Sequence, residues 1–250
     1  LRFEEDPVRS LRAIRFCTKL DFKINNNIKE AIYKKGHLLS SVSNARLFDE
    51  FCKIFLNGMA EKNFNKLVSF GLNKYLVSTN LNGCEFSNQL IIEALRNTDN
   101  RIKNNQSVTP GFLIAALLWP QLIKKSLKGN EINLKKFFRS MDSILRNQQK
   151  ITAIPRKFHT YIKDIWVLQL KLHSRIGRQP YKTLKHPRFR AAYDFLLVRE
   201  KAAAKTKDLG LWWTEFQKNN EDLKKKLIND LKKNNLEESS KIFGFSKELR

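Results

Sequence analysis

The fold class follows from one stretch of sequence, Thr109-Pro110-Gly111-Phe112-Leu113-Ile114-Ala115-Ala116-Leu117-Leu118-Trp119. Thr109 and Pro110 form a helix start signal, and residues 112–119 are apolar on every side of the helix that follows. A helix that is apolar all round has to be buried, so this one is expected to lie at the centre of the molecule. The run is much shorter than the roughly 20 apolar residues of a transmembrane helix, and we expect no part of the chain to span a membrane.

On both sides of this segment, apolar residues recur at helical spacing, whereas the alternation typical of a half-buried strand is hard to find. The sequence therefore predicts an all-α fold with no sheet. Asp6 and Pro7 are expected to open a helix that runs to about Leu20, with Asp6 as its N-cap. Breaks are expected where Gly, Pro, Asn and charged residues cluster, at residues 80–83, 97–106, 128–130 and 177–180.

The composition favours a polyanionic partner. The chain of 250 residues has 48 Lys plus Arg and 24 Asp plus Glu, which gives a formal net charge of +24. The Lys- and Asn-rich runs also fit compositional drift in an AT-rich genome, so charge alone leaves a basic surface without a partner as an alternative. The three cysteines lack zinc-site spacing, and their odd number indicates a reducing compartment, for which the cytoplasm is expected. The four histidines also lack ligand spacing, and we expect no metal site.

Residues 5–16, with the sequence EDPVRSLRAIRF, form the most informative motif. At roughly 100° per residue, Arg9, Arg12 and Arg15 fall within about one third of the helix circumference, and apolar residues cover the other side. Asp6 and Arg9 lie one turn apart and present an acceptor beside donors, as the edge of a nucleobase requires. Arginines a turn further along would then meet the triphosphate of the same nucleotide. The alternative is that Asp6 only caps the helix and that the arginines form a solvated face.

This motif resembles the nucleotide-selecting motif in the neck of class II nucleotidyltransferases, the group that contains bacterial poly(A) polymerases and CCA-adding enzymes. The resemblance implies that Asp6 and Arg9 hydrogen-bond the incoming base. It also implies that Arg12 and Arg15 contact the nucleotide or organise its site, and that Glu5 holds Arg9. Later segments are similar to the body of bacterial poly(A) polymerases and favour that subfamily: Asn97–Ile102, Thr109–Leu113, Asp164–Leu170, His186–Asp194 and Trp212–Phe216.

The same resemblance divides the chain. Residues 1–83 would form the neck, 84–217 an RNA-binding helical body, and 218–250 a basic tail that is a solvated helix or partly disordered. The family's catalytic head carries a Gly-Ser turn and an Asp-x-Asp pair that binds two metal ions, and neither pattern occurs here. We therefore expect this chain alone to be inactive, with ATP as the substrate and Mg²⁺ needed only together with a head.

A second basic region surrounds the break at Gly177–Pro180. Its cationic side chains are predicted to bind the RNA backbone: Arg175, Arg178, Lys182, Lys185, Arg188 and Arg190. Phosphate contacts give sequence-independent affinity that falls steeply with salt, which suits an enzyme that accepts many RNA 3′ ends.

The function implied by the resemblance is the addition of AMP from ATP to RNA 3′ ends. Such tails mark bacterial RNA for decay, so the RNA decay machinery is a candidate partner. Two alternatives stay open: a headless, non-catalytic RNA-binding remnant, and a CCA-adding tRNA nucleotidyltransferase.

Overall fold

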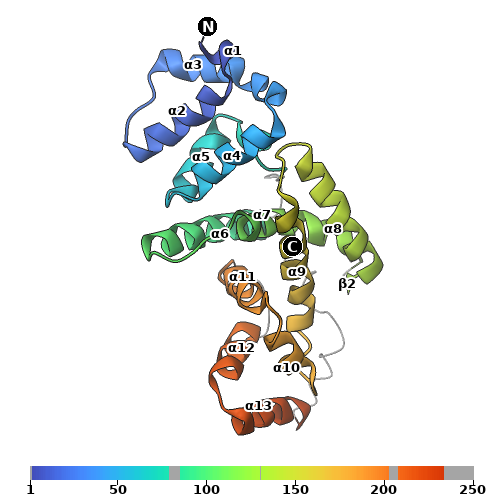
Figure 1. The fold of residues 1–250 in the computed structure, drawn as a ribbon. Coiled ribbons are helices and arrows are strands. Elements are labelled where there is room, and N and C mark those ends of the chain that lie inside the picture. Colours follow the sequence, from blue (N-terminus) through green and yellow to red (C-terminus); the bar gives the residue numbers. More distant parts are fainter. Residues whose placement is uncertain (1, 79–84, 130, 203–207, 234–250) are drawn as a thin grey trace.

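The computed structural model describes residues 2–78, 85–129, 131–202 and 208–233 (Figure 1). Within these ranges nearly all regular structure is helical, which confirms the all-α fold class. The N-terminal half contains these elements: α1 (Arg2–Glu5), α2 (Val8–Lys19), α3 (Asn26–Lys35), the 3₁₀ helix η1 (Gly36–Ser41), α4 (Asn44–Phe55), α5 (Ala60–Ser69), the 3₁₀ helix η2 (Asn73–Tyr75) and α6 (Glu85–Lys103).

The C-terminal half begins at the segment that decides the fold class. Its elements are α7 (Pro110–Ser126), strands β1 (Leu127–Lys128) and β2 (Glu131–Ile132), α8 (Leu134–Gln149), α9 (Arg156–Leu172), α10 (Gln179–Leu184), α11 (Phe189–Lys201), α12 (Leu209–Lys218) and α13 (Glu221–Lys233). The helices form an elongated arrangement, with α1 to α5 at one end, α6 to α9 in the middle, and α10, α12 and α13 at the other end (Figure 1). Within the described ranges, no helix combines the length and apolarity needed to cross a membrane.

Helix α7 is the buried central helix that the sequence predicts. Every side chain from residue 113 to residue 119 is buried, and α7 packs against α6, α8 and α9. The Thr109 hydroxyl caps its N-terminus by accepting a hydrogen bond from the Phe112 backbone N–H at 3.2 Å. Trp166 links α9 to α7, because its indole Nε1 donates a hydrogen bond to the Ala115 carbonyl at 2.9 Å.

The apolar side chains form two clusters. The larger one is continuous from Val8 on α2 to Ala202, just after α11, and includes the buried face of α4. The smaller one joins the end of α9 to α11, α12 and α13 and is rich in aromatic rings. Trp213 lies at its centre, fully buried, and donates from Nε1 to the Leu172 carbonyl at 2.9 Å. The second cluster thus fixes the C-terminal helices to the end of α9.

Three local expectations differ from the structure. The predicted cap at Asp6 is wrong: Pro7 is the N-cap residue of α2, which has no side-chain cap hydrogen bond. The break at 97–106 begins only after Lys103, because α6 continues through the Asn- and Asp-rich stretch. In that stretch, Asp99 binds the N-terminus of α5, because its carboxylate accepts hydrogen bonds from the backbone N–H groups of Ala60 and Glu61.

The third difference is a small sheet where none was expected. Strands β1 and β2 pair antiparallel beside Gly129, whose positive φ of 63° suits a tight turn. The expected break at 80–83 lies outside the described residues, as do residues 234–250 of the predicted tail. The described part of that tail contains helix α13, with Ile228 packed into the smaller cluster.

Candidate nucleotide site and nucleic-acid interface

The motif helix α2 is fixed by its apolar side. Val8, Leu11 and Ile14 are fully buried against the core, and α2 packs on α4 and α5. With that side buried, the helical period turns Arg9 and Arg12 toward the surface, where both side chains are partly exposed. The sequence pattern therefore translates directly into a cationic face.

Asp6, two residues before α2, lies next to the arginines at the start of that face. Its Oδ1 accepts a hydrogen bond from Nη2 of Arg46 on α4 at 2.8 Å. Its Oδ2 lies 3.8 Å from Nε of Arg9 and 3.6 Å from Nη1 of Arg12. Three guanidinium groups thus share one carboxylate, so this cluster keeps a net positive charge, and the side chain of Arg9 stays 45% exposed. Such a site presents both a hydrogen-bond acceptor and charged donors to a ligand.

A second carboxylate, that of Glu50, binds one of the arginines in this cluster. Glu50 of α4 is buried, with 1% of its side chain exposed, and its Oε1 accepts from Arg12 Nε at 3.4 Å and Lys53 Nζ at 3.1 Å. Its Oε2 is buried without a hydrogen-bond partner among the described residues. Sequence reasoning missed Glu50 and Arg46. The available signal was a carboxylate directly before Phe51 on the apolar face of α4.

Arg15 and Glu5 lie apart from the Asp6 cluster. The Arg15 guanidinium carbon lies 4.4 Å from the centre of the Phe16 ring, in a cation–π contact. Glu5 is exposed, and within the described ranges it makes no ion pair or hydrogen bond with Arg9. The structure thus brings Asp6, Arg9 and Arg12 together, and it places Arg15 one turn further along α2.

The basic segment, residues 175–190, combines exposed charges with aromatic contacts. Arg178, Lys182 and Lys185 are exposed in and around α10. The guanidinium carbon of Arg175 lies 5.6 Å from the Trp212 ring centre, and that of Arg188 lies 5.0 Å from the Tyr161 ring centre. Residues 175–190 contain no Asp or Glu, so the exposed charges of Arg178, Lys182 and Lys185 can attract an anionic partner.

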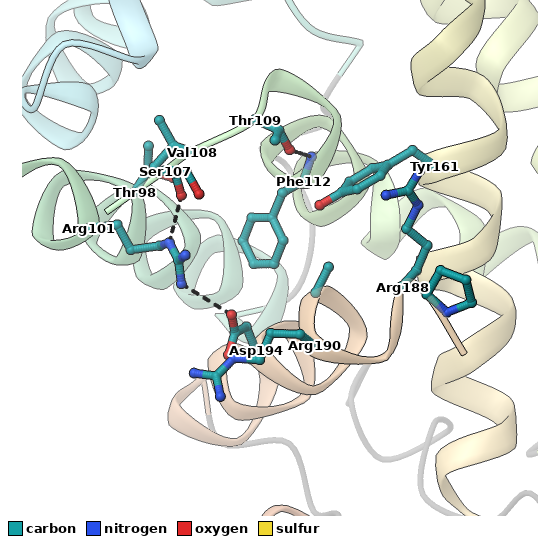
Figure 2. A pocket seen from close by; sticks show the side chains of 12 residues that line it. Thr98, Arg101, Ser107, Val108, Thr109, Phe112, Tyr161, Arg188, Arg190 and Asp194 are labelled. Carbon is teal, nitrogen blue, oxygen red and sulfur yellow. Dashed lines mark hydrogen bonds and ion pairs between the residues drawn. The ribbon is translucent and has the colours of Figure 1, made fainter. Parts of the chain in front are cut away.

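Arg190 is the exception, because it belongs to an ion-pair group. Asp194 Oδ1 pairs with Arg190 Nε and its Oδ2 with Arg101 Nη1, both at 3.1 Å. This group lies in the wall of a pocket of about 210 Å³ between α6, α7, α9 and α11 (Figure 2). Burial raises the pKa of Asp194, and the two arginines act in the opposite direction.

His173, just after α9, lies close to the basic segment. Burial, together with the charges of Arg199 and Arg175, lowers the pKa of His173 to about 3. It is therefore neutral at pH 7. Among the described residues, no group of three or more His, Cys, Asp or Glu side chains is placed to hold a metal ion.

Two family models match the chain. One, described as "Polymerase A arginine-rich C-terminus", covers residues 130–242. The other, described as "Probable RNA and SrmB- binding site of polymerase A", covers residues 21–79. The first region includes the basic segment, and the second includes Arg46, Glu50 and Lys53.

Individual relatives agree with these models. Poly(A) polymerase I of Salmonella typhi is 36% identical over 241 residues, which is 92% of this chain and 52% of the relative. Poly(A) polymerase I of Haemophilus influenzae is 35% identical over 239 residues, with 92% of this chain and 53% of the relative covered. The chain therefore spans about half the length of these curated relatives.

CCA-adding enzymes match a shorter stretch. The enzyme of Lactococcus lactis is 40% identical over 75 residues, which is 30% of this chain and 19% of the relative. The long matches thus distinguish between the two subfamilies that share the motif. On these matches and on the cationic face of α2, the chain belongs to the bacterial poly(A) polymerase family of class II nucleotidyltransferases.

Proposed function

We propose that this chain selects the nucleotide and holds the RNA in a template-independent poly(A) polymerase, which adds AMP from ATP to RNA 3′ ends. In this proposal residues 1–83 form the neck, 84–217 the RNA-binding body and 218–250 a basic tail. The chemistry belongs to a catalytic head outside these 250 residues, and this chain alone is inactive. ATP is the substrate, RNA 3′ ends and the RNA decay machinery are the partners, and the protein acts in the cytoplasm.

The observation that carries the proposal is the shared use of Asp6 by Arg9, Arg12 and Arg46. Asp6 offers an acceptor and Arg9 offers donors, so the pair can bind the donor and acceptor on the edge of adenine. Arg12 and Arg15 are proposed to support the nucleotide further along α2. Glu5 is proposed to support the nucleotide site, although among the described residues it makes no ion pair with Arg9. The bond between Arg46 and Asp6 fixes the carboxylate, which reduces the freedom lost when a base binds.

The basic segment is proposed to hold the RNA. Arg175, Arg178, Lys182, Lys185, Arg188 and Arg190 bind phosphates, which every RNA shares. Mg²⁺ is assigned to the catalytic head, because the family resemblance places the paired metal-binding carboxylates there.

The test is 3′ extension of a labelled RNA by the full reading frame, with each nucleotide supplied separately in the presence of magnesium. Long tails with ATP alone are the expected result. A short addition that needs CTP would move the protein to the CCA-adding branch. If the RNA bound in a salt-sensitive manner but no nucleotide extended it, a non-catalytic RNA-binding remnant would be the better account.

A further inference from the structure

The pocket beside the basic segment has aromatic walls. Phe112, at the start of α7, and Tyr161, on α9, both line it and are only partly buried (Figure 2). Phe112 is held edge-on against Phe195, with the ring centres 6.3 Å apart and the planes at 85°. Gly111 allows Tyr161 to approach α7, because a Cβ at residue 111 would lie 2.9 Å from Tyr161 Cδ1. The walls are therefore two rings fixed by their surroundings.

The opposite side of the pocket is polar and cationic. Arg101 is fixed at two points, since its Nε donates to the Ser107 carbonyl and its Nη1 to Asp194, both at 3.1 Å. Arg190 pairs with the other oxygen of Asp194, and Arg188 lies over the outer wall formed by Tyr161 (Figure 2). Three guanidinium groups and one carboxylate therefore line the pocket. The arrangement suits a ligand that is both aromatic and anionic.

The size of the pocket narrows the choice of ligand. A volume of about 210 Å³ is below the roughly 300–1,000 Å³ of sites for drug-sized ligands, and it suits one ring system. We propose that this pocket binds one nucleotide unit, with the base against Phe112 and Tyr161 and the phosphate against Arg188 and Arg190. The proposal rests on the proposed function, because a chain that binds RNA or ATP is in contact with nucleotides, which combine an aromatic base with a phosphate. The unit is either a residue of the bound RNA strand or a free mononucleotide.

A neighbouring hollow of about 270 Å³ continues the surface past the ion-pair group. Arg101, Arg190 and Asp194 also line this hollow, together with the amide side chains Asn97, Asn100, Asn104 and Gln106. The Nδ2 atom of Asn97 is buried without a hydrogen-bond partner in the described part of the chain. Amides that offer both donors and acceptors suit the sugar or base of a second nucleotide. A strand in the pocket would therefore find polar contacts for its next unit.

The experiment compares two single-stranded RNA probes on the 250-residue chain by fluorescence anisotropy. One probe is a labelled oligoadenylate, and the other is an abasic oligoribose phosphate with the same number of phosphates. Tyr161→Leu removes a ring wall, and Arg188→Ala removes an exposed charge that packs on it. Arg178→Ala, outside the pocket, removes one charge from the same basic segment as the matched control. Circular dichroism melting establishes that each variant folds.

We expect the unmodified chain to bind oligoadenylate more tightly than the abasic probe. Because base stacking on one aromatic ring is worth roughly fivefold or more in affinity, Tyr161→Leu should reduce that difference by about this factor. Arg188→Ala should weaken the oligoadenylate more than the abasic probe, because a base in the pocket is what brings its phosphate to Arg188. Arg178→Ala should weaken both probes equally. Ultraviolet cross-linking of the oligoadenylate, mapped by mass spectrometry, should yield a peptide that contains Phe112 or Tyr161.

Competition with AMP separates the two sources of the nucleotide. If AMP binds and displaces the cross-link at Phe112 or Tyr161, the pocket takes a free mononucleotide; if only the oligonucleotide labels it, the pocket takes a residue of the strand. Equal losses for both probes in all three variants, with no cross-link in the pocket, would overturn the proposal. Failure of the full reading frame to extend RNA would refute the polymerase function and leave a positive binding result intact.

Discussion

The arginines of α2 and those of the basic segment are held in different ways. On α2, Arg9 and Arg12 share the Asp6 carboxylate with Arg46, and the buried Glu50 holds Arg12 from below. In the basic segment, Arg175 and Arg188 lie over aromatic rings, and their neighbours extend into solvent. Carboxylates fix the direction of a guanidinium and neutralise part of its charge, whereas aromatic rings support the guanidinium and leave its charge in place.

The two arrangements suit different kinds of recognition. A base edge is read by a few hydrogen bonds in fixed directions, so it requires guanidinium groups that are already oriented. Phosphates are read as charge, so they require net positive potential more than direction. Four variants test this division between oriented arginines and freely exposed charges.

The largest effect on the free energy of unfolding is expected from Trp213→Ala, which removes a ring from the smaller apolar cluster that packs beside the basic segment. Trp213 is fully buried, and its ring centre lies 5.2 Å from that of Phe189 and 5.6 Å from that of Phe216. Truncating a buried tryptophan removes about 3–5 kcal/mol from the free energy of unfolding. Urea denaturation measures this loss. Leu211→Ala, an exposed position on the same helix, is the control, and a loss for Trp213→Ala no larger than the control's would contradict the anchoring role.

The second effect concerns phosphate binding. The triple variant Arg178→Ala, Lys182→Ala and Lys185→Ala should weaken RNA binding roughly a hundredfold at about 0.1 M salt and reduce the steepness of log affinity against log salt by about 2. Filter binding over a salt series measures both quantities. The matched control removes three exposed charges from elsewhere: Lys124, Lys125 and Arg146. An equal loss in the control would mean that net charge, rather than this segment, attracts the RNA.

The third effect concerns base choice. In the full reading frame, Arg9→Ala should lower kcat/KM for ATP by about 10- to 100-fold and reduce the preference for ATP, because one oriented pair of hydrogen bonds to a base is worth about 1–3 kcal/mol. Single-nucleotide extension kinetics measure it, with Arg139→Ala on α8 as the exposed control. Unchanged kinetics for all four nucleotides would remove Arg9 from the base-selecting site.

The smallest effect is expected from Glu50→Gln. The unfolding free energy should change by less than about 1 kcal/mol, because Arg12 and Lys53 are exposed enough to be hydrated and the unpaired Oε2 no longer carries buried charge. ATP use should nevertheless fall a few-fold as Arg12 loses its orientation, with the exposed Asp49→Asn as the control. A large loss of stability together with normal ATP use would make Glu50 a purely structural residue.

Local patterns predicted the frame of the molecule well. Thr109 and Pro110 open α7 as expected, and residues 113–119 are buried because every side of that part of the helix is apolar. The cationic face of α2 also follows from the sequence, because Arg9 and Arg12, at helical spacing, turn toward the surface once the apolar side is buried.

The predictions that were wrong, and the pocket that was missed, depended on contacts between residues far apart in the sequence. Asp6 does not cap α2, because Arg46, 40 residues later, holds its carboxylate. The Asn-rich end of α6 stays helical because Asp99 binds the start of α5, a tertiary contact that outweighs weak helix propensity. The pocket was missed for the same reason: Arg101 and Asp194 are 93 residues apart in sequence.

The larger apolar cluster couples the packing of helices that are distant in sequence. It runs without a break from α2 to the end of α11, and the rings of Phe48 on α4 and Phe158 on α9 meet within it, 6.4 Å apart. Helix α2 therefore cannot lose its packing without exposing side chains that also support α7 and α9, and the buried amides of these helices should exchange with solvent through one cooperative opening. Among the described residues, we therefore expect α2 and the central helices α7 and α9 to move as one body.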